Sequence, residues 1–271
     1  MKTLIFLSDT HTNSTVGLSK PNVKRGDGES VAAGTARRWL FWQYEEILQQ
    51  IEKEKQGELY AVLNGDMIEL DAKGRNATEL ISHNQTEAVG YAVEVLEPLY
   101  AMCKGVYMMR GTDAHTGKQA QGEEAIAANF ENTIKNPDTG AASWYWLPLE
   151  FDGVRMDIAH HPKGAGSGRP MNYKAGIDRM AADALFSYAD EGQLPPHLVV
   201  RSHLHGYRDS GSAFRTRAII TPAFCLLTAY TYRVGINASN PIGAIMVHCN
   251  NGQYEVKPLT RKVSKPQWQV I

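Results

Sequence analysis

The sequence predicts a layered α/β fold in a single domain, and three observations support this prediction. Short apolar runs alternate with segments of helical periodicity through the first 110 residues, which is typical of a mostly parallel sheet covered by helices. After residue 140 the pattern changes to short strands separated by turn signals, so a second sheet is expected. Residues that commonly bind metals follow directly after several of the apolar runs. We expect residues 1–271 to form one two-sheet sandwich with helices outside, in which residues 12–57 are an insert made of a long loop and a helix.

In the first half of the chain, strands are predicted where a short apolar run ends at a polar turn. These strands lie at residues 2–8, 59–63 and 106–109. Helices are predicted where apolar residues recur every three or four positions, and Gly57 ends the first of them. These helices lie at residues 35–56, 84–102 and 123–130. Residues 12–34 are rich in Gly, Ser, Asn and Lys and are predicted to form a long loop, and loops of that length are usually functional.

In the second half, the strongest local signal is Asp152-Gly153, which lies between two apolar segments and predicts a hairpin turn. A helix is predicted over residues 172–189. The strands of this half are predicted at residues 144–151, 154–159, 198–201, 213–221, 243–249 and 254–259.

Composition restricts the classes of protein to consider. The chain is 43% hydrophobic and 21% charged, as is usual for a globular protein, and its net charge of -1 gives no overall field that attracts DNA or an anionic membrane. The three cysteines are scattered without a CxxC pair, which indicates a reducing compartment and predicts that each is a small buried apolar residue. No apolar stretch approaches the roughly 20 residues of a membrane helix, and the apolar run at the N-terminus is too short for a signal peptide. We therefore expect a soluble, cytoplasmic protein with no membrane partner.

Five clusters of Asp and His lie just after predicted strands, and six of the nine histidines belong to them. The clusters are Asp9-Thr10-His11, Gly65-Asp66, Gly111-Thr112-Asp113-Ala114-His115, His160-His161 and His203-Leu204-His205. Each cluster alone is weak evidence, because a Gly-Asp pair is usually a turn and an Asp-x-His is usually a cap. Together they indicate a ligand site, since open α/β sheets bind ligands outside the carboxyl ends of their strands. Oxygen and imidazole donors without thiolates suit Mn, Fe, Zn or Ni better than they suit a closed structural zinc site.

The order and spacing of these clusters resemble the calcineurin-like metallophosphoesterase family, from residue 2 to about residue 206. The layout is similar to a subgroup found in bacteriophage and prophage genomes. The resemblance implies a four-layer α/β/β/α sandwich of the metallophosphoesterase type, with two divalent metal ions bridged by Asp66. Mn is the first choice for these ions, with Fe, Zn or Ni as alternatives. The positions that match the family's metal ligands are Asp9, His11, Asp66, His160, His203 and His205.

The third motif departs from the family, which has Gly-Asn-His where this chain has Gly-Thr-Asp-Ala-His. In the family the asparagine completes the shell of the second metal and the histidine acts on the leaving group. One hypothesis makes Asp113 a ligand and His115 the general acid; the alternative makes Asp113 a cap and His115 a solvated loop residue. A third carboxylate would reduce the net charge of the site from about +1 to about zero and weaken phosphate binding, so we favour Asp113 outside the ligand set. The candidates for further ligands, or for contacts with the ligands, are Thr112, Asp113, His161 and Asn64.

By the same resemblance, the chain is expected to hydrolyse a phosphodiester or phosphomonoester with a hydroxide bridged by the two metal ions. Asp66 and His115 are the expected catalytic residues. A glycine-rich segment after His161 carries Lys163 and Arg169, which either bind phosphate or belong to a merely flexible loop.

Two other functions remain open at this point. One is a nuclease acting on DNA or RNA ends, and the near-neutral charge then favours a nucleotide or a single-stranded end over a duplex. The other is a catalytically weak metal-binding scaffold, which the altered third motif favours. The nearly complete ligand set argues against the scaffold, because clustered buried histidines and carboxylates without metal would be costly to desolvate.

Overall fold

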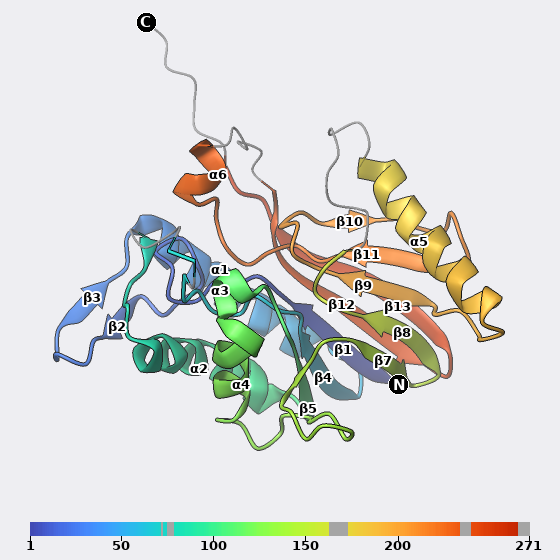
Figure 1. The fold of residues 1–271 in the computed structure, drawn as a ribbon, viewed down its shortest axis with the longest axis horizontal. Helices are drawn as coiled ribbons and strands as arrows, with labels where there is room; N and C mark the ends of the chain where they lie inside the picture. The colour runs from blue at the N-terminus through green and yellow to red at the C-terminus, as the bar shows by residue number, and fades with distance from the viewer. Residues whose placement is uncertain (72, 75–78, 163–172, 234–239, 265–271) are drawn as a thin grey trace, which may run out of the picture.

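The computed structural model describes residues 1–71, 73–74, 79–162, 173–233 and 240–264, and its centre consists of two β-sheets packed face to face (Figure 1). The larger sheet has the strand order β13-β12-β1-β4-β5-β6. Its strands are β1 (Lys2–Leu7), β4 (Glu58–Leu63), β5 (Gly105–Met109), β6 (Ser143–Trp144), β12 (Ile242–Asn250) and β13 (Gln253–Arg261). Strands β1, β4, β5 and β6 run parallel, while β12 and β13 form an antiparallel edge. The predicted parallel sheet is therefore present, with one antiparallel hairpin added to it.

The smaller sheet has the order β10-β11-β9-β8-β7. Its strands are β7 (Leu147–Phe151), β8 (Val154–Ile158), β9 (Leu198–Arg201), β10 (Arg208–Asp209) and β11 (Arg217–Ile220). Strands β8, β9 and β11 are parallel to one another, whereas β7 and β10 pair antiparallel at the two edges. The carboxyl ends of β8 and β9 therefore lie at the same edge of this sheet.

Helices cover the outer faces of both sheets (Figure 1). The larger sheet is covered by α1 (Thr35–Glu54), α2 (Gln85–Met102) and α4 (Gln121–Ala127), and the smaller sheet by α5 (Tyr173–Asp190). Three short elements complete the described chain: α3 (Asp113–Thr116), the 3-10 turn η2 (Lys118–Ala120) and α6 (Ala229–Arg233). The resulting order of layers is α/β/β/α, which confirms the predicted fold class. No helix in the described part of the chain is both long enough and apolar enough to cross a membrane.

Strand β1 shows why the central strands are almost continuously apolar. Leu4 and Phe6 pack between the two sheets, whereas Ile5 and Leu7 pack under the helices of the larger sheet. Both faces of the strand are buried, so the alternation of polar and apolar residues seen in one-sided sheets is absent.

Two hairpin turns lie against each other and link the sheets. Asp152 and Gly153 have φ values of 50° and 78°, and Asn251 and Gly252 have values of 47° and 85°. Positive φ at both central residues is the pattern of a type I′ turn, which Asp-Gly and Asn-Gly favour. The amide of Gly252 donates to the carbonyl of Asp152 at 2.8 Å. The hairpin predicted at Asp152-Gly153 is confirmed, and this contact joins it to the larger sheet.

The prediction of a long loop over residues 12–34 is wrong in part. This segment contains a small hairpin of β2 (Asn22–Lys24) and β3 (Ser30–Ala32), which projects from the body of the molecule (Figure 1). Each strand has only three residues, and Val23 alone among them is buried. Such short strands leave no measurable alternation in the sequence, so the hydrophobic pattern gave no signal.

Candidate metal centre

The six predicted metal ligands meet where the carboxyl ends of β1, β4, β8 and β9 converge. Asp9 and His11 follow β1, Asp66 follows β4, His160 follows β8, and His203 and His205 follow β9. The altered third motif follows β5 and lies beside them, because Thr112 contacts Asp66. Loops from both sheets therefore contribute to one site.

Five of these six residues have a left-handed backbone, which is rare for side chains other than glycine. Their φ values are 50° for Asp9, 42° for His11, 53° for Asp66, 71° for His203 and 54° for His205. Each such residue costs about 1–2 kcal/mol relative to an ordinary conformation. Strain of this kind persists only where the surroundings enforce it, and it is concentrated at functional sites.

Two glycines allow the loops to approach so closely. A Cβ atom at Gly65 would lie 2.4 Å from Nδ1 of His160, and one at Gly111 would lie 2.3 Å from the amide nitrogen of Asp66. Backbone bonds then hold the loops together, with the amide of Asp9 donating to the carbonyl of Gly65 at 2.9 Å. Gly65 is thus required by the close approach of His160, and Gly111 by the close approach of Asp66.

Asp66 is the central residue of the site, and its side chain is fully buried. Its Oδ1 accepts a hydrogen bond from the amide of Thr112 at 2.6 Å. Its Oδ2 lies 3.0 Å from Nε2 of His160 and 3.8 Å from Nδ1 of His203. Burial alone would raise the pKa of Asp66, but the charge and hydrogen bonds of the neighbouring histidines outweigh it and hold this pKa well below its ordinary value. Asp66 is therefore an ionised carboxylate in the interior.

A second group lies around Asp9. Its Oδ1 is 3.5 Å from Nε2 of His205, and that nitrogen is 3.3 Å from Nε2 of His11. Asp9 is fully buried, and its Oδ1 has no hydrogen-bond donor among the described residues. A buried carboxylate oxygen without a donor is costly unless a cation binds it. The donor set therefore fits a divalent cation held by Asp9, His11, His205 and Asp66.

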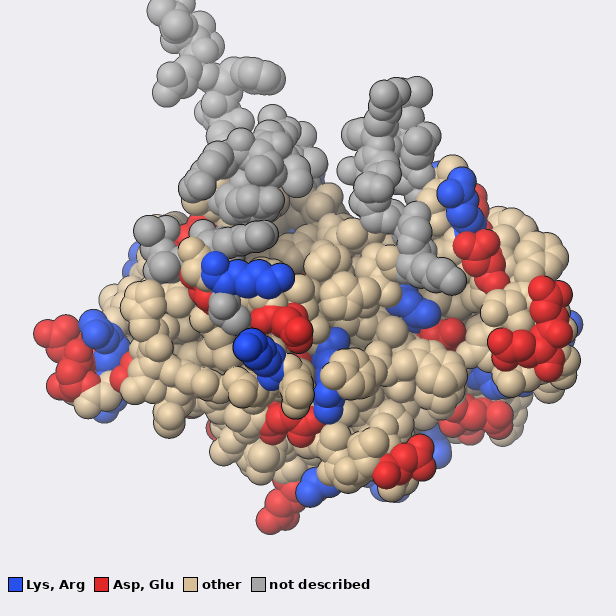
Figure 2. Space-filling model, in the orientation of Figure 1, with Lys and Arg blue, Asp and Glu red and all other residues tan. Residues whose placement is uncertain are grey.

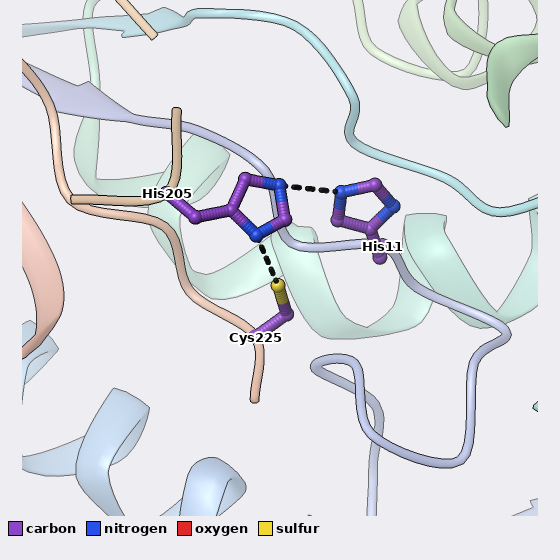
Figure 3. A group of neighbouring side chains, drawn as sticks. All are labelled: His11, His205 and Cys225. Carbon is purple, nitrogen blue, oxygen red and sulfur yellow. Dashed lines mark hydrogen bonds between the residues drawn. The ribbon is translucent and has the colours of Figure 1, made fainter. Parts of the chain in front are cut away.

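Three of the histidines direct Nε2 into the site, while their Nδ1 contacts a backbone carbonyl, a carboxylate or a thiol of the protein. Nδ1 of His160 donates to the backbone carbonyl of Asn64 at 2.7 Å, and Nδ1 of His11 lies 3.2 Å from Oε2 of Glu69. Figure 3 shows the third case, in which Cys225 Sγ lies 3.5 Å from Nδ1 of His205. Metal-binding histidines in proteins are usually oriented in this way.

The environments of these histidines change their pKa values in opposite directions. Burial lowers the pKa of His205 to about 4, so its ring is neutral near pH 7. Burial also acts to lower the pKa of His160, but the charge of Asp66 and the hydrogen bond to it raise that pKa to about 10. A cation bound between His160 and Asp66 has to displace this proton, so binding is expected to weaken as pH falls.

Cys225 and Glu69 were not predicted from the sequence as parts of the site. Burial and the charge of Asp9 raise the pKa of the Cys225 thiol well above its ordinary value, so it remains a neutral group behind His205. The three cysteines are buried and free, as predicted, but Cys225 also contacts a predicted ligand. Only the folded chain brings Cys225 to His205, and the sequence carries no spacing signal for it.

Glu69 links His11 to His115. Its side chain is 3% exposed, and its Oε2 lies 3.2 Å from Nδ1 of His11 and 2.6 Å from Nδ1 of His115. Burial would raise the pKa of Glu69, but the hydrogen bonds from both rings outweigh it and lower the pKa to about 2. Burial would lower the pKa of His115, but the hydrogen bond to Glu69 and the nearby carboxylates outweigh it and raise this pKa above its ordinary value. The His115 ring is therefore held against a buried carboxylate.

Glu123 is a further buried carboxyl group, located in the first turn of α4. It accepts hydrogen bonds from the amide of Gly111 at 2.8 Å and from the amide of Met67 at 3.4 Å. Burial and the charge of Asp66 raise the pKa of Glu123 to about 8. This side chain ties the loop of the second motif to the loop of the third.

The remaining predicted site residues lie farther from the carboxylates or outside the described chain. Asn64 orients His160 through its carbonyl, and its side chain donates to the hydroxyl of Ser202. Asp113 is the exposed first residue of α3 and belongs to none of the metal-ligand groups among the described residues. Lys163 and Arg169, predicted as phosphate-binding residues, lie outside the described residues.

A cavity of about 410 Å³ opens beside His160 and His161. Its lining includes Arg110, Thr112, Tyr145, His160 and His161. The guanidinium of Arg110 lies 4.1 Å from the centre of the Tyr145 ring, whose side chain is 69% exposed. A cationic group and an open aromatic ring therefore flank the candidate metal site.

Comparison with known proteins adds structural similarities at low sequence identity. No protein-family model matches the sequence, and no curated protein matches it. One similar solved structure is Vps29 from Entamoeba histolytica complexed with Zn²⁺, at 7% identity and a TM-score of 0.43, covering 95% of this chain and 98% of that chain. Another is Vps29 from Cryptosporidium parvum, at 10% identity and a TM-score of 0.40, covering 97% and 98% respectively. A dimetal phosphatase from Danio rerio is 10% identical with a TM-score of 0.40, covering 95% of both chains. All three TM-scores are below 0.5, and we base no function on these similarities.

The raised pKa of Glu123 predicts a stability difference that depends on pH. The folded state keeps the proton of Glu123 up to about pH 8, whereas the unfolded chain releases it near the ordinary value of 4.5. The free energy of unfolding should therefore fall as pH rises between these values, because the unfolded state binds fewer protons. The variant Glu123→Gln stays neutral and should escape this loss. With chelator present, the free energy of unfolding of the variant relative to that of wild type should rise by a few kcal/mol from pH 5 to pH 8, since one pKa unit equals about 1.4 kcal/mol.

Urea denaturation at several pH values measures this difference. Glu131→Gln, at an exposed position, is the matched control and should show no such trend. A constant difference between Glu123→Gln and wild type across the range would contradict the raised pKa.

Proposed function

We propose that this chain is a metal-dependent phosphoesterase with two divalent cations, related to the calcineurin-like metallophosphoesterases of the phage and prophage type. One observation carries the proposal: the buried carboxylate Asp66 shares a group of possible metal-ligand residues with Asp9 and His160, and its Oδ2 lies 3.8 Å from Nδ1 of His203. Asp9, His11 and His205 would hold one cation, and His160 and His203 the other, with Asp66 shared between them. Two cations bound there would supply positive charge for the phosphoryl oxygens and an activated water near neutral pH.

His115 is suited to protonate the leaving group. Its Nδ1 is fixed by Glu69, which leaves Nε2 free to donate a proton. The ring is partly exposed, so a bound ester has access to it. A pKa above the ordinary value keeps the proton on His115 near neutral pH, as a general acid requires.

The cavity beside His161 favours an ester that carries a flat ring, such as a nucleotide. The exposed face of Tyr145 offers a stacking surface, and the guanidinium of Arg110, which also pairs with Glu124 at 3.3 Å, lies next to it. Figure 2 shows acidic and basic side chains interspersed over the face of the molecule that it presents, without a broad basic region among the residues that it colours. Such a surface supports a small phosphate ester or a single-stranded end over a DNA duplex.

The scaffold alternative explains the structure less well. A protein that only binds metals needs the ligands and the groups that orient them. It has no need of a histidine that is fixed by a buried carboxylate and left with one free nitrogen. The pair of Glu69 and His115 therefore favours an enzyme.

Replacing Asp66 tests the shared carboxylate. After metal stripping, wild-type protein should hydrolyse bis(p-nitrophenyl) phosphate or p-nitrophenyl phosphate when Mn²⁺ is restored. Asp66→Asn should lose at least about 100-fold in this rate, because even groups that merely orient metal ligands contribute roughly 10–100-fold. The ratio of diester to monoester turnover narrows the substrate class.

The control for this experiment is Asp138→Asn, at an exposed position away from the clusters. Wild-type protein that binds two cations yet hydrolyses neither ester under Mn²⁺, Zn²⁺ or Fe²⁺ would replace the enzyme proposal with the scaffold.

Replacing His115 tests its role as a proton donor. His115→Ala should slow hydrolysis of an ester with a poor leaving group by about 10²–10⁴-fold, the usual contribution of a general acid. The same variant should slow a p-nitrophenyl ester much less, because p-nitrophenolate leaves without protonation. His83→Ala, at an exposed histidine, is the control. Equal losses on both leaving groups would assign His115 a structural role instead.

Replacing Tyr145 tests whether the substrate carries a nucleobase. Tyr145→Ala should raise KM for thymidine 5′-(p-nitrophenyl phosphate) by roughly 5- to 100-fold, because stacking of a base on an aromatic ring is worth about 1–3 kcal/mol. It should change KM little for methyl p-nitrophenyl phosphate, which has the same leaving group and no nucleoside. Tyr145→Phe keeps the ring and should behave as wild type. An equal rise in KM for both esters would remove the stacking role.

A further inference from the structure

We propose that His161 is a direct ligand of the second cation and takes the place of the amide oxygen that the altered third motif lacks. This inference rests on the proposed binding of two cations and goes beyond it. It assigns the second cation three imidazole ligands in addition to Asp66: His160, His161 and His203.

Three atoms that can bind a metal converge on the hydroxyl of Thr112. Thr112 Oγ1 lies 3.1 Å from Oδ2 of Asp66, 3.2 Å from Nε2 of His161 and 3.2 Å from Nδ1 of His203. A hydroxyl has one proton and donates it to one acceptor at a time. Neutral imidazole nitrogens and a carboxylate that converge on one point are the donors that a divalent cation requires.

The spacing of the three rings is further evidence. One ligand atom from each of His160, His161 and His203 lies within 4.8 Å of the others. Donors in a tetrahedral zinc site are about 3.4 Å apart, because zinc binds imidazole nitrogen at about 2.0–2.1 Å. The three rings therefore need only small side-chain rotations to share one ion.

The orientation of His161 agrees with this role. Its ring is 4.8 Å from that of His160 at an interplanar angle of 87°, and 4.7 Å from that of His203. Among the described residues, the hydrogen bonds of the His161 ring go to Thr112 alone. The ring is thus directed at the site without being tied to another structural partner there.

A third imidazole affects which metal binds but not the charge of the site. Imidazole suits Zn, Fe or Ni, whereas carbonyl oxygen, carboxylate and water suit Mn and Mg. The second position should therefore prefer Zn²⁺ or Co²⁺ to Mn²⁺. Because imidazole is neutral, the positive charge that attracts a phosphate ester is retained.

Cobalt titration of the full chain tests this ligand. Wild-type protein stripped of metal should take up two Co²⁺, with calorimetry giving the affinities and visible absorption reporting the donors of each ion. His161→Ala should bind the first Co²⁺ as wild type does. It should bind the second at least about 100-fold more weakly, since loss of a group that merely orients a ligand already costs roughly 10–100-fold. X-ray absorption of the zinc-loaded proteins should show fewer imidazoles per zinc in the variant.

Controls separate this ligand from the function proposed above. His161 is exposed, so the metal-free variant should have the same melting temperature as metal-free wild type. His83→Ala, at another exposed histidine, should bind both ions with unchanged affinity. Two Co²⁺ bound by His161→Ala with wild-type affinity and spectrum would overturn the His161 assignment and leave the two-cation proposal intact. Wild-type protein that binds only one Co²⁺ would overturn both.

Discussion

The buried carboxylate of Asp66 connects the parts of this molecule on which a function depends. It follows a strand of the larger sheet, accepts a hydrogen bond from the next loop of that sheet, and contacts histidines from the smaller sheet. An ionised carboxylate in the interior must be compensated by charge or by hydrogen bonds. The positions of the third motif and of the His160 and His203 loops are all consistent with that requirement.

The same requirement accounts for the conformational cost of the site. Asp9, Asp66 and three histidines adopt left-handed backbone conformations, and Asp9 keeps an oxygen without a donor among the described residues. These features reduce stability, and nothing in the packing of the two sheets needs them. They are explained if the loops were selected to present donors to cations.

The sequence was sufficient for the layers and for most of the residues that meet at the sheet edge, because both depend on local patterns. Apolar runs gave the longer strands to within a few residues, whereas the short strands β2, β3 and β10 left no such signal, and β6 and β7 were predicted as one strand. It was not sufficient for Glu69, Glu123 and Cys225, whose roles depend on contacts between loops distant in the chain. In sequence Glu123 has the appearance of an ordinary residue in the first turn of a helix. Glu123 is buried only because α4 packs against the loops that follow β4 and β5.

The third motif shows how a change in spacing is accommodated in three dimensions. His115 lies two residues farther along than the histidine of the family pattern that the sequence resembles, and in an extended loop this offset would carry it roughly 7 Å farther along the chain. In this chain Thr112 begins a helical turn, and its carbonyl accepts hydrogen bonds from the amides of His115 at 2.9 Å and Thr116 at 3.0 Å. The turn carries the His115 ring back to Glu69 and to within 4.6 Å of the His11 ring. Helix α3 therefore holds a histidine beside the carboxylates, while Asp113 is turned towards solvent.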